Sequence, residues 1–266
     1  MTAFRQVPFE LSEGRPDVRI GVIVPFDFAL DREYWCYTPS DVTLHITRTP
    51  HVDEPLGMGL VEAVSDDDVI CGAVGELVAP DPELIVYACT SGSFVRGRDG
   101  ERRIRQTMKE AGARHAITTS GALLDALAAL GIRRLAVGTP YDEPVTRRLA
   151  DFLEESGVDV VSVAYLGLRG GVDRVTADSL THLTVAADAA DADAVFLSCT
   201  NLATFDALTD LEARLGKLVL SANQVTMWSA LSAVDRVVDL DQQLFIRTAT
   251  GRPARHPSRA QRERTP

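Results

Sequence analysis

The chain lacks the features that mark membrane-bound and disulfide-stapled proteins. No apolar run approaches the roughly 20 residues of a membrane span, and the first residues show no basic segment followed by an apolar one, the form of a secretion signal. The four cysteines have no CxxC spacing and are too sparse for a disulfide framework. With 45% hydrophobic, 24% charged and only 6% aromatic residues, the composition is typical of a soluble globular protein. We therefore expect a cytoplasmic chain with reduced thiols.

Positive charge is scarce except at the end of the chain. The 27 Lys and Arg face 38 Asp and Glu, for a net charge of −11, yet residues 247–266 hold six Arg and one Glu. The tail thus carries +5 and the remaining body −16. Because so acidic a body repels phosphate backbones, we expect no nucleic-acid partner. The tail, rich in Pro, Arg and Thr, is typical of a disordered extension.

Motifs for three other kinds of site are also missing. The five His residues show no H-x-x-x-H spacing, and no G-x-S-x-G occurs, which argues against a metal centre and a hydrolase elbow. GSFVRGRD at 92–99 has the glycine spacing of a phosphate loop, but Arg98 and Asp99 stand where Lys and a hydroxyl are needed. The sequence therefore predicts neither a metal nor a cofactor.

Short β-branched runs alternate with segments of helical periodicity. We expect strands at residues 19–25, 42–47, 84–89, 115–119, 134–139, 159–166, 194–199 and 217–222, and helices at about 63–79, 99–112, 120–130, 143–156, 173–189, 202–215 and 223–234. Strands that are apolar on both faces and separated by helices indicate parallel sheets covered on each side. The predicted fold class is therefore α/β.

The order of these segments repeats within the chain. RIGVIVP at 19–25 resembles RLAVGTP at 134–140, and LIVYACTS at 84–91 resembles AVFLSCTN at 194–201. The repeat predicts two similar parallel-sheet halves related by a pseudo-twofold axis. Ligands of open parallel sheets bind beyond the carboxyl ends of the strands, so we expect the active-site cleft between the halves.

The repeat also suggests the domain organisation. Residues 18–119 are expected to form the first half and residues 120–236 the second. Residues 1–17, polar with scattered Pro and Gly, are expected to form a flexible arm. Residues 237–266 are expected to form a C-terminal extension that is basic and disordered from 247.

Cys89 and Cys199 end equivalent strands, and each is followed by Thr and further polar residues. One such cysteine by itself is better explained as a small buried hydrophobe. Packing has no need of hydroxyl and amide neighbours, however, so the recurrence in both halves favours a catalytic pair facing one another across the cleft. Backbone N–H groups at a strand-to-helix turn stabilise a thiolate or hold a carboxylate. Cys36 and Cys71 lack this setting and are expected to be structural.

These cysteines, with ACTSGSF at 88–94, SCTNL at 198–202 and TPY at 139–141, resemble the Asp/Glu racemase superfamily. The resemblance is strongest to the branch containing maleate cis–trans isomerases, arylmalonate decarboxylases and ectoine-utilisation proteins. It covers about residues 18–236, and SANQVTMW at 221–228 is similar to the ectoine-utilisation members.

The resemblance implies roles for the two thiols. In the decarboxylases the position of Cys89 is a glycine, and the remaining cysteine donates a proton. In the isomerases both positions are cysteine, one a nucleophile toward the double bond and the other an acid or base. In the racemases the thiols work on opposite sides of a Cα. This chain has the two-cysteine set, with Cys89 as nucleophile or first base and Cys199 as acid or base on the opposite face.

The resemblance also implies a binding site for a substrate carboxylate. The matching positions are Pro25 at the pocket wall, Thr90, Ser91 and Tyr141, and the backbone near Thr200; Asn201 adds an amide to this donor set. Hydroxyl and amide donors stabilise enediolate-like charge, and losing one costs about 10²–10³ in rate. Tyr141 is also open to a packing role, as an aromatic in a turn before a helix.

The chain departs from the isomerase pattern in two places. Where the isomerases carry an Asn shortly after the first strand's Pro, this chain has VPFDFALD, with Phe28 nearest that place and Asp27 beside it. A second pocket Asn, expected in the loop after the sixth strand, is replaced by LGLRGGVD. That loop is open to two interpretations, a flexible cover over the cleft or a plain turn. Maleate is therefore one candidate substrate among several.

Together these patterns predict a cofactor-independent isomerase that acts on a small carboxylate or dicarboxylate. The reaction would be cis–trans isomerisation of the maleate isomerase kind or racemisation, with ectoine-type catabolism as a candidate setting. The alternatives are an arylmalonate decarboxylase-like enzyme and a non-catalytic small-acid binding protein. We expect a homodimer without a nucleic-acid or membrane partner.

Overall fold

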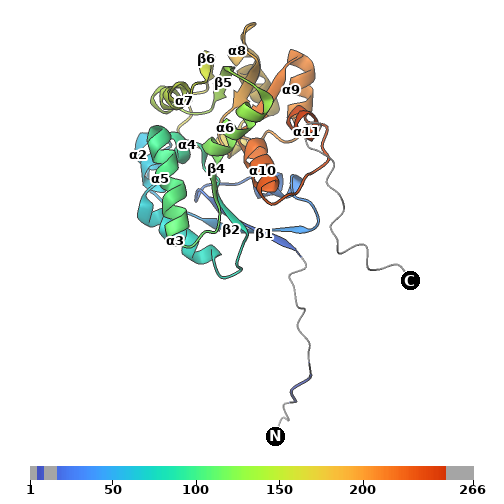
Figure 1. Cartoon of the computed structure of the whole chain (residues 1–266). Helices are drawn as coiled ribbons and strands as arrows, with labels where there is room; N and C mark the ends of the chain where they lie inside the picture. Colours follow the sequence, from blue (N-terminus) through green and yellow to red (C-terminus); the bar gives the residue numbers. More distant parts are fainter. Residues whose placement is uncertain (1–4, 9–16, 250–266) are drawn as a thin grey trace, which may run out of the picture.

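Two four-stranded parallel sheets form the centre of the folded molecule (Figure 1). The structure, a computed structural model, describes residues 5–8 and 17–249. The first sheet has the order β2-β1-β3-β4 and the second β6-β5-β7-β8. The strands are β1 (Val18–Val24), β2 (Val42–Arg48), β3 (Leu84–Tyr87), β4 (Ala116–Thr118), β5 (Arg134–Thr139), β6 (Asp159–Tyr165), β7 (Ala194–Leu197) and β8 (Leu218–Ser221). Because both sheets follow one order, the predicted α/β fold of two similar halves is confirmed.

Helices follow the strands in both halves. They are α1 (Asp31–Cys36), α2 (Met58–Val64), α3 (Asp67–Leu77), α4 (Thr90–Phe94), α5 (Gly97–Glu110), α6 (Thr119–Leu130), α7 (Glu143–Glu155), the 3-10 turn η1 (Val172–Arg174), α8 (Ala177–Ala187), α9 (Leu208–Leu215), α10 (Ala222–Ala233) and α11 (Gln243–Ala249). Thr118 and Ser221 cap the equivalent helices α6 and α10, their hydroxyls accepting from backbone N–H groups. Such caps satisfy donors that a helix start leaves free.

The strand register brings the predicted site residues to one edge of each sheet. Ile23 on β1 pairs with Tyr87 on β3, which places Pro25 and Cys89 just beyond neighbouring strand ends. In the second sheet Gly138 on β5 pairs with Leu197 on β7, and Cys199 follows two residues later. The two cysteines therefore leave their sheets at equivalent places.

The helix that follows the last strand of each half packs on the sheet of the other half. Leu123 and Leu127 of α6 lie in one core cluster with β5, β7 and β8, whereas Met227 and Leu231 of α10 lie in a cluster with β1, β2 and β3. The two helices also pack against each other in the middle of the molecule (Figure 1). This exchange joins the halves through buried apolar side chains.

Four short helices were not expected from the sequence. These are α1, α2, α4 and α11, each of seven residues or fewer. The helix expected at 202–215 begins only at Leu208, and residues 247–249, expected to be disordered, are the last turn of α11. Most of the expected N-terminal arm, and the tail from residue 250, lie outside the described residues. Among the described helices, none combines the length and apolar character needed to cross a membrane.

Candidate active site

A cavity between the two halves is lined by every residue that the sequence predicted for the site. These residues are Pro25, Cys89, Thr90, Ser91, Tyr141, Cys199, Thr200 and Asn201. The first four belong to the first sheet's strand ends, and the other four follow β5 and β7 of the second sheet. Residues more than 100 positions apart in the chain are thus brought to one space, as the repeat predicted.

The cavity is narrow and largely shielded from solvent. The volume open to the centres of water molecules is about 30 Å³, which is room for about two waters. Cys89 and Thr90 are 4% and 1% exposed. A substrate with several heavy atoms therefore enters only if lining side chains move. Once it is inside, polar groups act on it with little competition from water.

Cys89 precedes α4 and turns its thiol back over the start of that helix. Its Sγ accepts from the backbone N–H of Gly92 at 3.4 Å and lies 3.9 Å from Oγ of Ser91. A Cβ at position 92 would lie 3.1 Å from this sulfur and even closer to the hydroxyl of Tyr87. Glycine is therefore the residue that leaves space for the N–H to reach the sulfur. Gly92 and Tyr87 were not predicted from the sequence.

Cys199 adopts a backbone conformation that side chains rarely take. Its φ is 93°, in the region that favours glycine. The N–H of Asn201 and the hydroxyl of Tyr141 lie near its sulfur and favour the thiolate, and the Ser198 hydroxyl donates to Tyr141 at 3.3 Å. Tyr141, 1% exposed, thus lies in the site beside the second thiol.

The two thiols are harder to ionise than an ordinary cysteine. Burial raises the pKa of Cys89, and burial raises the pKa of Cys199 to about 12. Hydrogen bonds from Gly92 and Asn201 oppose this rise, whereas the nearby charge of Asp27 adds to it. The strand-end N–H groups do favour the thiolates, as expected. The pKa of each thiol is nevertheless raised overall, because desolvation is the larger effect.

One buried hydroxyl of the cavity is left without a partner. Among the described residues nothing bonds to Oγ1 of Thr90, although the Thr90 carbonyl accepts from Ser93 and Ser120. A buried hydroxyl without a partner costs free energy, so it is suited to bonding a ligand that enters the cavity.

Asn201 is partly occupied by contacts between the halves. Its side-chain amide donates to the Asp27 carbonyl at 3.0 Å and its Oδ1 accepts from the Ala29 N–H at 2.9 Å. These bonds tie the segment after β7 to the segment after β1. One amide N–H remains for the cavity, so Asn201 contributes less to ligand binding than its place in the sequence suggested.

The remaining lining residues form an apolar wall with one acidic side chain. They are Asp27, Phe28, Leu56, Leu60, Val64 and Val172. Burial raises the pKa of the Asp27 carboxyl, and the charge of Asp173 adds to the shift. Val172 belongs to the Gly-rich stretch LGLRGGVD at 166–173. The Arg169 carbonyl of this stretch accepts from the N–H of Leu56 at 3.2 Å. The stretch therefore borders the cavity, where a cover over the cleft would lie. The apolar members could not be told from core residues.

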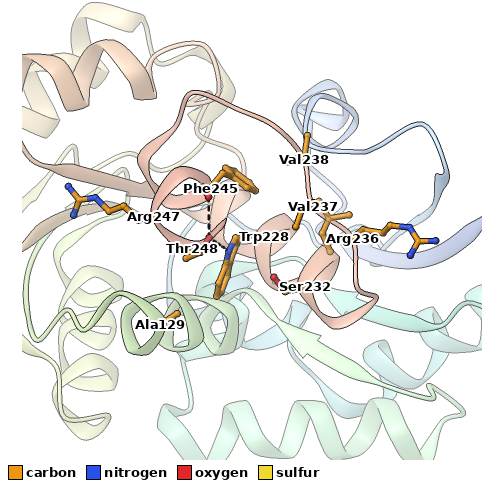
Figure 2. Close-up of a pocket in the computed structure, with 10 residues that line it drawn as sticks. Ala129, Trp228, Ser232, Arg236, Val237, Val238, Phe245, Arg247 and Thr248 are labelled. Atoms are coloured by element: carbon orange, nitrogen blue, oxygen red, sulfur yellow. Dashed lines mark hydrogen bonds between the residues drawn. The ribbon is translucent and has the colours of Figure 1, made fainter. Parts of the chain in front are cut away.

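A second hollow of the surface has a different character. It is a groove of about 410 Å³, drawn in Figure 2, where Trp228 of α10 donates to the hydroxyl of Thr248 of α11 at 2.9 Å. None of the described residues that line it is Cys, Asp, Glu or His. Cys36 and exposed Cys71 line neither space. No group of three or more metal-binding side chains occurs in residues 5–8 and 17–249.

Comparisons with known proteins agree with this arrangement. The sequence profile of the arylmalonate decarboxylase family matches residues 57–245. The chain is 34% identical to arylmalonate decarboxylase from Bordetella bronchiseptica over 80% of this chain and 88% of the relative. It is 27% identical to maleate isomerase from Alcaligenes faecalis over 80% of this chain and 89% of the relative.

Solved structures show the same fold. A liganded arylmalonate decarboxylase, in which one glycine is changed to cysteine and one cysteine to serine, superposes with a TM-score of 0.78 at 29% identity, over 86% of this chain and 98% of the other. Maleate isomerase Iso from Pseudomonas putida S16 superposes with a TM-score of 0.74 at 26% identity, over 82% and 93%. The matched profile spans well over half of the chain, and it includes both strand-end cysteines. This chain therefore belongs to the arylmalonate decarboxylase family, within the Asp/Glu racemase-like superfamily.

Proposed function

We propose that the protein is a cofactor-independent isomerase in which Cys89 and Cys199 act on one small carboxylate or dicarboxylate. The observation that carries the proposal is the presence of both thiols in one cavity, each supplied by a different half of the molecule. A cavity built only for packing does not need two thiols and four hydroxyl or phenol groups. The enzymes of the family to which the chain belongs support a reaction driven by cysteine.

Two reaction courses fit two thiols on opposite sides of a substrate. In cis–trans isomerisation, the Cys89 thiolate forms an S–C bond to one alkene carbon while the π pair moves toward the carboxylate. The remaining single bond rotates, and the S–C bond breaks as the double bond re-forms. In racemisation, one sulfur removes the Cα proton and the other returns one to the opposite face. Neither course adds or removes an atom overall.

The surroundings of the two sulfurs suit them to different roles in the reaction. Cys199, whose pKa is raised to about 12, keeps its proton at neutral pH and is suited to donate it. The pKa of Cys89 is also raised, but its sulfur accepts from the Gly92 N–H at 3.4 Å, a contact that stabilises the transient negative charge of a nucleophile. Charge that develops on the substrate carboxylate would be met by the hydroxyls of Thr90, Ser91 and Tyr141.

Decarboxylation of a malonate-like acid is the second candidate. The family profile and the 34% identity to an arylmalonate decarboxylase favour it. In that reaction the carbon–carboxylate bond breaks, CO₂ leaves with no electron pair, and a thiol protonates the resulting enediolate. Cys199 alone suffices for this step, so the presence of Cys89 favours the isomerase.

Intact-protein mass spectrometry tests the isomerase. The Cys199→Ser variant, incubated with maleate or citraconate, is expected to gain the mass of one substrate on Cys89, because removal of the proton donor slows completion of the cycle. The Cys89→Ser variant is the matched control and should gain nothing. An adduct on another residue, or equal adducts in both variants, contradicts the nucleophilic role of Cys89.

Incubation in D₂O separates the remaining courses. Solvent deuterium at Cα of an unconsumed amino-acid derivative indicates racemisation, and release of CO₂ from an aryl malonate indicates decarboxylation. The absence of adduct, exchange and CO₂ with these substrates would contradict the proposal.

A further inference from the structure

Glu33 on α1 is a buried carboxylate that reaches from the first half into the loop after β7. Its side chain is 5% exposed. Its Oε1 accepts from the backbone N–H groups of Thr204 at 2.6 Å and Phe205 at 3.0 Å. Its Oε2 accepts from the side-chain amide of Asn223, on α10, at 2.7 Å and from the hydroxyl of Thr204 at 3.4 Å. Four donors from two separate segments therefore converge on one carboxylate.

No Arg or Lys forms an ion pair with Glu33 in the part of the chain that the structure describes. Burial raises its pKa, and the bonds from Asn223, Phe205 and Thr204 oppose the rise. A buried carboxylate without a cation is costly compared with an apolar side chain. The geometry indicates its role: Thr204 and Phe205 belong to the segment that follows Cys199, and Asn223 donates to Thr200 of the same segment as well as to Glu33.

That segment, residues 199–205, is here called the Cys199 loop. It has no helix or strand of its own, since β7 ends at Leu197 and α9 begins at Leu208. Cys199, at its start, has a φ of 93°. Backbone strain of this kind persists only where the surroundings impose it, and it clusters at functional sites. The loop must therefore be held by side chains.

Asn223 bonds one end of the loop directly and the other end through Glu33. Its side-chain amide donates to the carbonyl of Thr200 at 2.9 Å and to Glu33, which accepts from Thr204 and Phe205. Asn201 adds two bonds to the segment after β1. Cys89 belongs to the first half, as Glu33 does, so these contacts set the position of Cys199 relative to Cys89.

We propose that Glu33 and Asn223 are positioning residues that hold the Cys199 loop in its strained conformation and so aim the Cys199 thiol at the substrate. The proposal rests on the proposed function, in which Cys199 reacts. Neither side chain lines the cavity, so both act through the loop. Asn223 is the Asn of SANQVTMW at 221–228, a stretch noted in the sequence only for its resemblance to other proteins. The proposal gives this residue a physical role.

The test is the reactivity of Cys199 in the full-length chain. In a background with serine at positions 36, 71 and 89, Glu33→Gln turns an amide N–H₂ toward donors that need an acceptor. Iodoacetamide should then alkylate Cys199 faster by about ten- to hundredfold, the effect of losing one bond to a charged acceptor. Amide hydrogen exchange should rise in peptides covering 199–207.

Two further variants make the result specific. Glu212→Gln is the matched control: Glu212 is also buried with a raised pKa, but it accepts from Val219 and Gln243 instead. It should leave Cys199 alkylation unchanged. Asn223→Asp added to Glu33→Gln restores a donor–acceptor pair and should recover part of the protection, although the Thr200 carbonyl stays without its donor.

If Glu33→Gln is not recovered as folded protein, Asn223→Ala serves instead, since it leaves the bonds from Thr204 and Phe205 in place. Unchanged alkylation and exchange in the folded variant overturn the proposal, as does an equal effect of Glu212→Gln. Neither readout needs a substrate, so failure here is distinct from a wild-type protein that shows no turnover. Where turnover is found, kcat should fall about tenfold with little change in KM, because misplacing a reacting group slows the reaction.

Discussion

At the scale of single residues, two residues of the candidate site lower the stability of the fold while lining the cavity where a ligand would bind. Thr90 keeps an unbonded hydroxyl at 1% exposure, and Cys199 keeps a φ that strains its backbone. Both cost free energy, and both line the same cavity. Departures from local preference that gather in one place indicate a functional site.

Thr90→Val tests whether the Thr90 hydroxyl lowers stability and contributes to turnover. The substitution keeps the shape of the side chain and removes a buried hydroxyl that has no partner, so the free energy of unfolding should rise by about 1 kcal/mol. Turnover should fall about 10²–10³-fold, the loss expected for one donor to developing negative charge. Urea unfolding and initial-rate measurements check the two parts.

Thr184→Val is the control for this substitution. The Thr184 hydroxyl is also fully buried, but it donates to the Leu180 carbonyl within α8 at 2.7 Å. Its loss should lower stability or leave it unchanged, and turnover should not change. If Thr90→Val retained wild-type turnover, the Thr90 hydroxyl would have no part in the reaction.

The raised thiol pKa values make the reactivity of Cys199 strongly dependent on pH. Because the pKa of Cys199 is raised to about 12, the neutral thiol predominates at neutral pH and the thiolate fraction grows throughout the alkaline range. In a chain with Cys199 as its single cysteine, iodoacetamide alkylation should rise about tenfold per pH unit from pH 7 to 10, since the thiolate is the nucleophile.

An ordinary thiol gives a different profile. With a pKa near 8.5, its alkylation rate levels off by about pH 9.5. The single-cysteine Cys71 variant provides the reference rate for an exposed site. A plateau for Cys199 below pH 9 would show that the hydrogen bonds from Asn201 and Tyr141 outweigh burial.

At the scale of elements, the strands could be predicted and the shortest helices could not. Every expected strand is present, with ends shifted by at most two residues, because continuous β-branched runs separate strands from amphipathic helices. Helices α1, α2, α4 and α11 span two turns or less, too few for a 3.6-residue period to show. The apolar pattern at 202–207 resembled a helix, yet bonds from Glu33 and Asn223 hold this segment as a loop.

The same limit applies to the site. Cys89 and Cys199 could be found because they repeat at equivalent strand ends, and the register of parallel strands then brings them together. Glu33 could not be found, because its donors lie about 170 to 190 positions away. The rise of the two thiol pKa values could not be predicted either. It is caused by burial, which depends on how the halves pack and not on the residues next to each cysteine in the sequence.

At the scale of the whole molecule, the exchange of α6 and α10 makes the two halves depend on each other. Each of these helices is connected in the chain to one half and places buried side chains in the core of the other: Leu123 and Leu127 of α6, and Met227 and Leu231 of α10. A cavity between two separable domains would widen and narrow freely. Here the halves share buried contacts, so we expect substrate access to come from the side chains and loops around the cavity, such as the stretch before Val172.

Leu231→Ala tests whether the halves unfold together. Leu231 lies on α10, is 1% exposed and packs in the core of the first sheet, so its truncation should lower the free energy of unfolding by about 2–5 kcal/mol. Because α10 follows β8 of the second half, both sheets should lose protection in one transition. Urea unfolding followed by tryptophan fluorescence, with hydrogen exchange read separately in the two sheets, provides the measurement.

Leu127→Ala is the reciprocal variant, because Leu127 of α6 is 2% exposed and packs in the core of the second sheet. It should lower the same single transition by a similar amount. Val185→Ala, at a side chain 43% exposed on α8, should change stability by less than about 0.5 kcal/mol. Two separate transitions, or loss of protection confined to the first sheet in Leu231→Ala, would show that the halves are independent and that the cavity between them opens as a hinge.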